Sequence, residues 1–597
     1  MKKKYLMSVL LIFSIVTMAQ NNQGNNVPRQ GNEVVQSQRD FNSERPNGDG
    51  TFSGFPGGPG GFPGGPGGFQ GGPGGFPGPW MMGGMGSIDQ FGVEFHDAFL
   101  EEDESSKSIA DAMSNDSSRM YFVENQHFTG KLRICFDGNN TTIEGSCPNG
   151  VKVSHRDGDV VIYCKGKAME LEFTGISDDG SIDIKSDSPV KIIFNGLSLR
   201  SQKGEAVKIN TPYPTYIELA SGSDNRLEDR FKEVDREGRW SFAPRPVESD
   251  YETEVIDGIE MRKSVNRAKV KDESPKVSGV LTSEGTLCFS GHGRLRIKGH
   301  NKSGIKSKGH MVFRAGNVIN VEVTQGKGIS AKGDIRILGG VLNIDGSDSG
   351  EDGLRCDGSM YIDGGWTVVK CGGGESSEGI ESKYNVEISG GTVEVASYDD
   401  AINSGGNLIV WGGKVFAASV MNDALDSNSN LLISGGYVVA LGGNAPECGL
   451  DSNEEEGFSL YINGGVVFAS GGMPTRTSDK SRQNSLIYNV EKADSGMVFC
   501  LSSGERPIQS FGLVRSYPRG GSLLFSSPLL KTGNSYEILL ADERSASAVI
   551  SGFHNTSDIL TSATGDKLES VEKLEGPLMT VGKRAMMFGP PMPPVQQ

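Results

Sequence analysis

The chain has 597 residues, of which 85 are glycine, and its 75 acidic and 58 basic side chains give a net charge of −17. This length accommodates several modules, and the glycine share, about twice the usual one, indicates many tight corners or a flexible linker. An acidic chain without basic clusters has no general attraction for nucleic acid, so we exclude such a partner, whereas an acidic surface suits divalent cations.

The N-terminus has the pattern of an export signal over residues 1–19. Three lysines precede an apolar run at 5–18, and Thr17 and Ala19 place small residues before the expected cleavage point. The apolar run is too short to predict a transmembrane anchor. We therefore expect a secreted, extracellular or cell-surface protein that does not span the membrane and is a monomer.

Residues 20–87 are polar at first and then repeat glycine, proline and phenylalanine. Such a composition cannot fill a core, so this segment is predicted to be a disordered linker.

One five-residue element recurs through the middle of the chain at steps of 22 to 26 residues. Its third position is always Ile or Leu, its second is Gly or Ala, and its fifth is small. The seven copies are residues 303–307, 327–331, 352–356, 378–382, 400–404, 423–427 and 448–452. A β-rich run broken by a glycine pair alternates with it, at residues 339–340, 364–365, 390–391, 412–413, 435–436 and 464–465.

A fixed period in the twenties is typical of a solenoid, in which units too small to bury their own apolar faces stack on one another. The third and fifth positions share one face of a strand and should point inward. The paired glycines suit corners with positive φ or close backbone contact. The Leu and Asn pattern of a leucine-rich repeat is missing. We therefore predict an all-β fold, a right-handed parallel β-helix with a β-rich C-terminal cap.

The organisation predicted after the linker has five parts. These are an N-terminal β region with the first rungs (88–220), a charged insertion (221–276), the regular β-helix (277–475), a C-terminal β cap (476–580) and a flexible tail (581–597). The eight cysteines are interpreted mainly as buried free thiols, although one disulfide among Cys135, Cys147 and Cys164 stays open.

Acidic residues recur at fixed places around the repeated element. The first position carries Asp352, Glu378, Asp400 and Asp423; the fourth carries Glu381, Asp426 and Asp451; and Asp357 follows one copy directly. Equivalent residues of stacked strands lie about 4.8 Å apart, where bare carboxylates repel. Ca²⁺ accepts carboxylate and amide oxygens and relieves this repulsion, so these eight residues are the candidate metal ligands. A solvated face with stacked Asn and Asp ladders is the alternative.

The rungs DGLRCDGSMYIDGG, EGIESKYNVEISGGTVEVASYDDAINS and DALDSNSNLLISGGYVVALGGNAPECGLDSN resemble a family of secreted carbohydrate-binding β-helix proteins related in fold to pectate lyases. The resemblance covers roughly residues 140–475 and extends over the C-terminal cap to about residue 555. It implies non-catalytic binding of plant-type or acidic polysaccharide with bound Ca²⁺. The chain departs from the family pattern where Ser303, Lys327 and Cys448 replace the first acidic residue, which puts metal in doubt at those rungs.

Aromatic side chains in the rungs are candidate platforms for sugars: Trp366, Tyr384, Tyr398, Trp411 and Tyr437. For each of them, the alternative is that the side chain fills a corner or the core of the coil. Two other functions stay open. A Ca²⁺-dependent polysaccharide lyase would use Lys332, Arg355 or Lys383 as its base, and a structural adhesin would use the coil as a rigid spacer.

Overall fold

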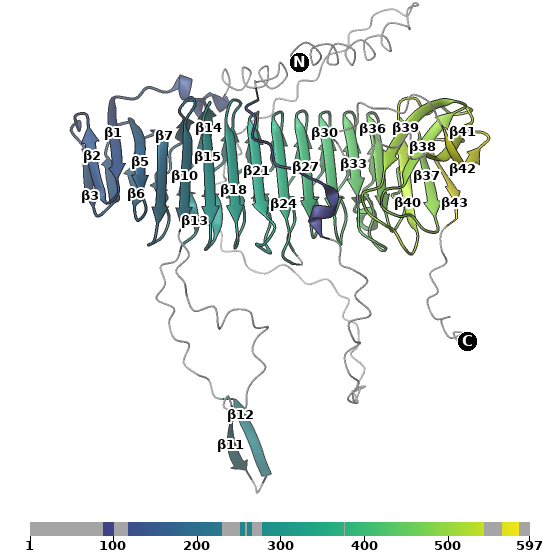
Figure 1. The fold of residues 1–597 in the computed structure, drawn as a ribbon, viewed down its shortest axis with the longest axis horizontal. Coiled ribbons are helices and arrows are strands. Elements are labelled where there is room, and N and C mark those ends of the chain that lie inside the picture. Colours follow the sequence, from purple (N-terminus) through teal and green to yellow (C-terminus); the bar gives the residue numbers. More distant parts are fainter. Residues whose placement is uncertain are drawn as a thin grey trace, which may run out of the picture. The chain divides into compact units, whose positions relative to one another are not determined.

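The computed structural model describes residues 87–100, 117–229, 277–374, 376–541 and 564–583, and the backbone of an antiparallel hairpin, β11 (Tyr251–Ile256) and β12 (Ile259–Ser264). The fold is all-β, a parallel β-solenoid of about eleven turns (Figure 1). The predicted fold class is therefore confirmed. The predicted signal peptide, the linker up to residue 86 and the tail from residue 584 lie outside the described residues.

Each complete turn contributes one strand to each of three parallel stacks. The first sheet consists of β3 (Val151–Arg156), β4 (Asp159–Cys164), β6 (Ser181–Ser186), β8 (Val207–Asn210), β13 (Gly279–Ser283), β16 (Ser303–Ser307), β19 (Ile329–Ala331), β22 (Leu354–Cys356), β25 (Ile380–Ser382), β28 (Ile402–Ser404), β31 (Leu425–Ser427) and β34 (Leu450–Ser452). The second stack, called the second sheet, consists of β9 (Thr215–Leu219), β14 (Leu287–Gly291), β17 (Met311–Phe313), β20 (Ile335–Ile337), β23 (Met360–Ile362), β26 (Val386–Ile388), β29 (Leu408–Val410), β32 (Leu431–Ile433) and β35 (Leu460–Ile462). The third consists of β10 (Asp224–Asp229), β15 (Arg294–Gly299), β18 (Val318–Val323), β21 (Val341–Gly346), β24 (Trp366–Cys371), β27 (Thr392–Ser397), β30 (Lys414–Ser419), β33 (Tyr437–Leu441) and β36 (Val466–Gly471).

The two ends of the coil depart from this parallel three-strand pattern, and the outermost strand of the first sheet, β3, pairs antiparallel with β4. At the N-terminal end, β1 (Gly130–Asp137) pairs with β2 (Asn140–Glu144) and with β5 (Met169–Ser177), and the long β7 (Val190–Ser201) pairs with both β9 and β10. At the C-terminal end, β36 pairs antiparallel with β40 (Gly521–Ser526), which continues to β37 (Ser485–Val490) and β43 (Leu578–Gly582). A separate antiparallel sheet contains β39 (Arg506–Gly512), β38 (Val498–Ser503), β41 (Tyr536–Ala541) and β42 (Gly565–Val571). These strands form the expected cap.

The Ile or Leu at the third position of the repeated element forms one continuous interior column. Ile305 is in register with Ile329, and the column continues through the later rungs as Leu354, Ile380, Ile402, Leu425 and Leu450. Each of these side chains is at most 1 % exposed. Their burial is the main stabilising contribution of the first sheet, because apolar surface removed from water stabilises in proportion to its area.

Where the fifth position is serine, its hydroxyl closes the corner after the first-sheet strand, whereas Ala331 and Cys356 occupy this position in β19 and β22. The hydroxyl of Ser404 donates to the carbonyls of Tyr384 (2.8 Å) and Asn407 (2.9 Å), and Ser427 repeats this pattern one rung later. A buried hydroxyl needs such partners. The fifth position is therefore small because its side chain faces a turn rather than the wide interior.

The second glycine of each pair has a positive φ. In the six pairs this angle lies between 72° at Gly391 and 84° at Gly465. Residues with a Cβ rarely adopt this conformation, so the corners between the second and third sheets require glycine. This confirms the sequence interpretation of the pairs.

The second position of the element is matched in size to a residue of the third sheet. A Cβ on Gly379 would lie 2.1 Å from Cγ1 of Val395, and one on Gly353 would lie 2.3 Å from Cγ1 of Val369. Where the element carries Ala401 or Ala424, the Val395 column continues as alanine, at Ala417 and Ala440. In these rungs glycine opposite valine and alanine opposite alanine fill a similar interior volume, whereas in the last rung Gly449 faces Ala469.

Two segments near the N-terminus run outside the coil. Residues 87–100 begin at the 3₁₀ helix η2 (Ile88–Phe91) and cross the outer side of the third sheet at β27, β24 and β21 (Figure 1). Phe91 is buried there against a cluster that includes Phe416 and Val368. Residues 117–125 contain the 3₁₀ helices η3 (Ser117–Tyr121) and η4 (Val123–Asn125), and Tyr121 contacts His310 at the start of β17.

Two sequence expectations change in detail. Strand β10 lies inside the coil and pairs with β7 and β15, so the rungs continue to Asp229 and the predicted start of the insertion at residue 221 is too early. All eight cysteines are free, so the disulfide considered among Cys135, Cys147 and Cys164 does not form.

Over the described residues, no helix has the length and apolarity needed to cross a membrane.

We predict that Gly379→Ala destabilises the protein by about 1–3 kcal/mol, because the added methyl group would lie 2.1 Å from Cγ1 of Val395 and 2.6 Å from the carbonyl oxygen of Ala401. The same substitution should cost clearly less in a Val395→Ala background, which copies the natural alanine pairs. A double-mutant cycle from denaturant unfolding measures this coupling. Gly204→Ala is the control, since a Cβ there meets nothing within 4 Å; equal losses in both Val395 backgrounds would contradict the size-matching explanation.

Candidate metal and ligand site

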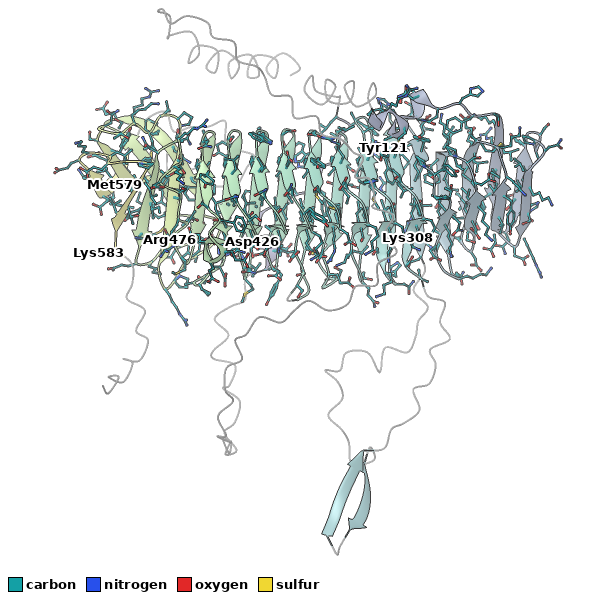
Figure 2. The ribbon with its side chains drawn as sticks, turned by 180° about the vertical axis from the view of Figure 1, so that it is seen from behind. Tyr121, Lys308, Asp426, Arg476, Met579 and Lys583 are labelled. Atoms are coloured by element: carbon teal, nitrogen blue, oxygen red, sulfur yellow. The ribbon has the colours of Figure 1, made fainter. Side chains whose placement is uncertain are left out.

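The acidic residues predicted as ligands gather on the outward side of the first sheet. The fourth-position column runs in register through Arg355, Glu381, Asn403, Asp426 and Asp451. The first-position residues lie just before the same strands. Lys308 and Asp426 lie along one edge of the coil and Tyr121 along the other (Figure 2). We call the outward side of the first sheet from β22 to β34, with the turns leading into it, the acidic face.

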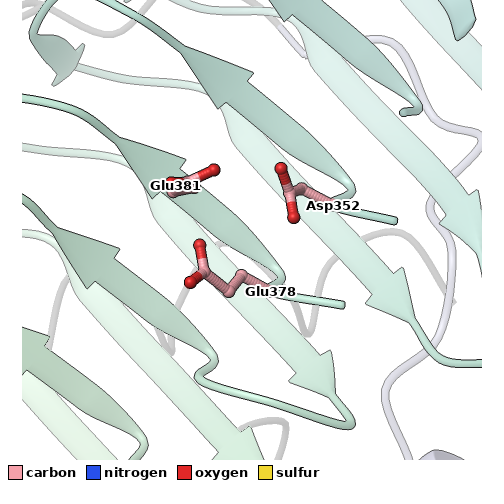
Figure 3. A group of neighbouring side chains, drawn as sticks. All are labelled: Asp352, Glu378 and Glu381. Carbon is pink, nitrogen blue, oxygen red and sulfur yellow. The ribbon is translucent and has the colours of Figure 1, made fainter. Parts of the chain in front are cut away.

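Three carboxylates converge at the N-terminal end of the acidic face. Oxygen atoms of Asp352, Glu378 and Glu381 all lie within 4.8 Å of one another, a spacing that could hold a metal ion (Figure 3). Asp352 and Glu378 come from successive turns that precede β22 and β25, and Glu381 is the middle residue of β25. Stacking of adjacent rungs therefore creates this cluster, which we call the N-terminal acid group.

Basic side chains already neutralise most of the N-terminal acid group. Lys327 Nζ lies 2.5 Å from Asp352 Oδ2, and Arg355 Nη1 lies 3.1 Å from Asp352 Oδ2 and 2.5 Å from Glu381 Oε2. Lys383 forms an ion pair with the other oxygen of Glu381. Burial by itself would raise the pKa of Asp352, but the Lys327 and Arg355 contacts hold it below its ordinary value. A divalent cation here would have to compete with these partners.

Glu378 is the member of this group that no basic residue is found to pair with in the described structure. Burial raises its pKa to about 8, and the carboxylates of Glu381 and Asp352 add to the shift. One oxygen accepts a hydrogen bond from Asn403 Nδ2 at 2.9 Å, while the other is buried without a hydrogen-bond partner. An orphaned buried oxygen of this kind would be satisfied by a proton or a cation.

A second cluster, the C-terminal acid group, follows from Asp399 to Asp451. Its members are Asp399, Asp400, Asp423, Asp426, Glu447 and Asp451. No ion pair with lysine, arginine or histidine is found for any of them across the described ranges. Asp423 N donates to Asp400 Oδ1 (2.9 Å), and Cys448 N donates to Asp423 Oδ1 (2.6 Å). Backbone amides thus fix these two carboxylates in orientation without cancelling their charge.

Burial, together with neighbouring carboxylates, raises the pKa of most members of the C-terminal acid group. Burial raises the pKa of Asp400 to about 9, with added repulsion from Asp426 and Asp423. Burial likewise raises the pKa of Asp423 to about 7 and that of Asp426 to about 6, and Asp451 adds repulsion to both. Burial also raises the pKa of Asp451 above its ordinary value. These carboxyls therefore favour proton uptake, or an external cation, over bare ionisation.

The donors of this group are of the kind that a hard divalent cation binds, although among the described residues three carboxylate oxygens lie within 4.8 Å of one another at the N-terminal acid group and not here. The group offers carboxylate oxygens from neighbouring rungs together with the amides of Asn403 and Asn428, and Ca²⁺ is bound by such oxygens. The amide nitrogen of Asn428 donates to Asn403 Oδ1 at 3.2 Å, so part of the stacked polar ladder considered as the alternative is also present. Asp357 forms ion pairs with Lys332 and with Arg355, which also pairs with Asp352 and Glu381 of the N-terminal acid group.

The five aromatic candidates do not form one platform. The ring of Trp366 stacks on His96 of the N-terminal segment (centroids 3.3 Å apart), and its indole nitrogen donates to Glu394 Oε1 (2.9 Å). Tyr398 and Tyr437 pack against the apolar cluster outside the third sheet. Tyr384, 63 % exposed, follows β25, whereas Trp411, 46 % exposed, follows β29 in the second sheet. Sequence spacing alone did not show that residues 87–100 cover Trp366.

Two members of the C-terminal acid group were missed by the sequence reasoning. Asp399 and Glu447 precede the first position of their elements, and each adds repulsion to the Asp426 carboxylate. An acidic residue directly before the element is a signal that could have identified both. The neutralising role of Lys327 follows from its place in the first-position column, one rung before Asp352.

One family model matches part of the chain. Residues 247–444 match a family model described as "Carbohydrate-binding domain-containing protein". The match spans about a third of the chain and contains the N-terminal acid group together with Asp400, Asp423 and Asp426. It agrees with the resemblance noted in the sequence. No curated protein matches the chain.

One solved structure is similar, a "polysaccharide lyase-like protein from C. thermocellum, Gadolinium derivative". The two chains are 18 % identical, the similarity covers 56 % of this chain and 96 % of that one, and the TM-score is 0.28. At this TM-score the similarity carries no argument about the function of this chain.

In the presence of a chelator, we predict that thermal stability falls as pH rises from 5 to 9. The folded protein holds protons on Asp426, Asp423, Glu378 and Asp400, with pKa values of about 6, 7, 8 and 9, which the unfolded chain releases near pH 4. The stabilisation from each of these carboxyls is complete below its pKa in the unfolded chain and is lost as pH rises through its pKa in the folded protein. Carboxylates whose pKa is lowered in the folded protein change its stability only below about pH 4.5, which is outside this range.

Scanning calorimetry at several pH values in chelator measures this loss. Asp400→Asn should flatten the profile at its alkaline end, because the amide cannot titrate. A wild-type melting temperature that is constant or rises from pH 5 to 9 would contradict the repulsion argument.

Proposed function

We propose that this chain binds extracellular polysaccharide, of plant type or acidic, through its acidic face, with bound Ca²⁺ and without catalysis. The observation that supports this most directly is the C-terminal acid group, six clustered carboxyls for which the described structure provides no basic partner. Nearby, Lys327, Arg355 and Lys383 neutralise the N-terminal acid group. The contrast indicates that the C-terminal group has its counter-charge supplied from outside the chain.

Asp400, Asp423, Asp426 and Asp451 are the residues that would hold the cation. Asp400 and Asp423 precede successive first-sheet strands, and Asp426 and Asp451 are in direct register on β31 and β34. When bound, Ca²⁺ supplies positive charge and open coordination positions that oxygen ligands can fill. The fixed carboxylates would keep the ion at the surface of the sheet, and a uronate carboxylate or sugar hydroxyl could then approach an otherwise repulsive surface.

Polysaccharide is proposed as the partner because the matched family model is one of carbohydrate-binding domains and its matched span contains most of the acidic face. The stacked rungs repeat the same surface along the coil, which suits an extended polymer better than a compact ligand. The export-signal pattern at residues 1–19 supports an extracellular place for this binding.

We predict that Asp426→Ala combined with Asp451→Ala lowers Ca²⁺ affinity at least tenfold, and that it abolishes most of the Ca²⁺-induced rise in melting temperature, because a ligand that binds only the folded state stabilises it. Titration calorimetry and thermal unfolding with and without Ca²⁺ measure the two effects. Asp137→Ala with Asp566→Ala is the matched control, as both residues are exposed acids away from the acidic face. Unchanged Ca²⁺ binding in the first variant would refute the site.

Glycan binding tests the partner. Retention on immobilised polygalacturonate should require Ca²⁺, disappear in chelator and be weakened by the Asp426/Asp451 variant, with the control variant unaffected. A screen of neutral and acidic glycans with and without Ca²⁺ would identify the preferred polymer. Failure to bind any glycan would sink the proposal and leave the rigid-spacer function as the better explanation.

The lyase alternative requires a base able to take a proton beside a uronate carboxyl. Each candidate is paired with carboxylates: Arg355 with Asp352 and Glu381, Lys383 with Glu381, and Lys332 with Asp357. We therefore expect no unsaturated product when the protein is incubated with polygalacturonate and Ca²⁺, as followed by ultraviolet absorbance. Product that disappears in Arg355→Ala would instead establish catalysis.

A further inference from the structure

The outward side of the first sheet changes its charge part-way along the coil. Its middle positions from β13 to β34 form one column in register, and they are, in order, Thr282, Lys306, Ser330, Arg355, Glu381, Asn403, Asp426 and Asp451. Lys208 on β8 extends this column at its N-terminal end. The charged members from β8 to β22 are therefore cations, and those from β25 onward are anions. We call the outward side of the sheet from β8 to β19 the basic half.

Three lysines of the basic half form no ion pair within the described part of the chain. Lys208 and Lys302 are exposed, and Lys306 is half-buried. By contrast, Lys308 pairs with Glu284 at 2.8 Å. Over the described residues, the first sheet therefore carries unpaired cations in the basic half and unpaired carboxylates in the C-terminal acid group.

The basic half and the C-terminal acid group lie too far apart to neutralise each other within one copy. Lys306 on β16 and Asp426 on β31 are five strand steps apart, which is about 24 Å along the coil. Figure 2 shows this separation for Asp426 and for Lys308, which follows β16. At about 0.1 M salt, charges more than about 10 Å apart are largely screened. Neither group can therefore be the partner of the other in the same molecule.

A second copy of the chain, turned end for end, brings the two groups together. When two first sheets lie face to face with antiparallel coils, the two-fold axis runs along the strand direction, and each position meets the one at the same distance beyond the axis. The column changes sign between β22 and β25, so we place the axis there. The facing residues are then Arg355 with Glu381, Ser330 with Asn403, Lys306 with Asp426, and Thr282 with Asp451.

The first-position column gives one further favourable contact and one unfavourable contact about the same axis. Lys327 would face Asp400, which has no basic partner among the described residues. Asp352 would face Glu378, a pair of like charge, although Lys327 and Arg355 already hold Asp352. Contacts of opposite charge therefore outnumber those of like charge, and each contact occurs twice in a symmetric dimer.

We propose that two copies of this chain associate through their first sheets, with antiparallel coils and the two-fold axis between β22 and β25. The strands from β13 to β34 would form a strip about 34 Å long and about 17 Å wide, or roughly 600 Å² per copy. This area is at the lower end for specific interfaces, so we expect a dissociation constant on the order of micromolar. The dimer replaces the monomer expected from the sequence, and it does not depend on glycan binding.

Sedimentation equilibrium of the full-length protein in chelator and about 0.1 M salt tests the inference. The chelator keeps Ca²⁺ from the carboxylates of Asp400 and Asp426, and the salt screens the general repulsion between two chains of charge −17. Lys306→Glu and Asp426→Lys should each weaken the dimer roughly tenfold or more, because each places like charges opposite one another. The two substitutions combined should restore the dimer, since the symmetric contact then has the same pair reversed. Lys152→Glu is the matched control, as Lys152 is an exposed lysine on β3, beyond the contact.

A carbodiimide, which joins a lysine amine directly to a carboxylate, gives a second measurement. A link between Lys306 and Asp426 found by mass spectrometry can form only between copies, because the two residues lie about 24 Å apart within one. A covalent dimer joined elsewhere would overturn the proposed register.

The outcomes also separate this inference from the proposed Ca²⁺ site. Lys306 is not a proposed ligand, so Lys306→Glu should leave Ca²⁺ affinity unchanged while it weakens the dimer. A wild type that stays monomeric up to about 0.1 mM would overturn the inference. So would a dimer that both single variants leave unchanged, or a combined variant that keeps the wild-type melting temperature and fails to recover.

Discussion

Parallel stacking of the rungs in one register is the constraint on which the rest of the structure depends. Because each strand lies about 4.8 Å from its equivalent in the next rung, any residue type that recurs in the repeat forms a column. For apolar residues the column is favourable, as in the interior series that begins at Ile305 and ends at Leu450. For carboxylates the same geometry is unfavourable, since like charges are held close together on a partly desolvated surface.

The acidic face resolves this repulsion in two different ways. In the N-terminal acid group the chain supplies its own counter-charges, with Arg355 joining two carboxylates of adjacent rungs. In the C-terminal acid group the partners are backbone amides and neighbouring acids, and burial together with the repulsion of neighbouring carboxylates raises the pKa of Asp400 to about 9. Carboxylates at equivalent positions of the repeat therefore have different surroundings, with basic partners in one group and, in the described structure, none in the other. A cation site is best sought where the chain provides no neutralising partner.

The outer surfaces of the coil are also unequal. Residues 87–100 pack on the third sheet, residues 117–125 pack on the N-terminal part of the second, and the cap extends the apolar cluster outside β30, β33 and β36. These contacts bury aromatic residues such as Trp366 that a repeat-based interpretation would place on a ligand surface.

The sequence by itself determined the solenoid, its interior column and its glycine corners, because these depend on local periodicity and on the positive φ that glycine tolerates. It also located the acidic columns, since register follows from the repeat. Only the tertiary structure decided that Lys327 and Arg355 neutralise the Asp352 rung, that Asp399 and Glu447 join the later acids, and that residue His96 covers Trp366. Those outcomes depend on side-chain reach across rungs and on contacts between segments far apart in the chain, which a repeat pattern does not encode.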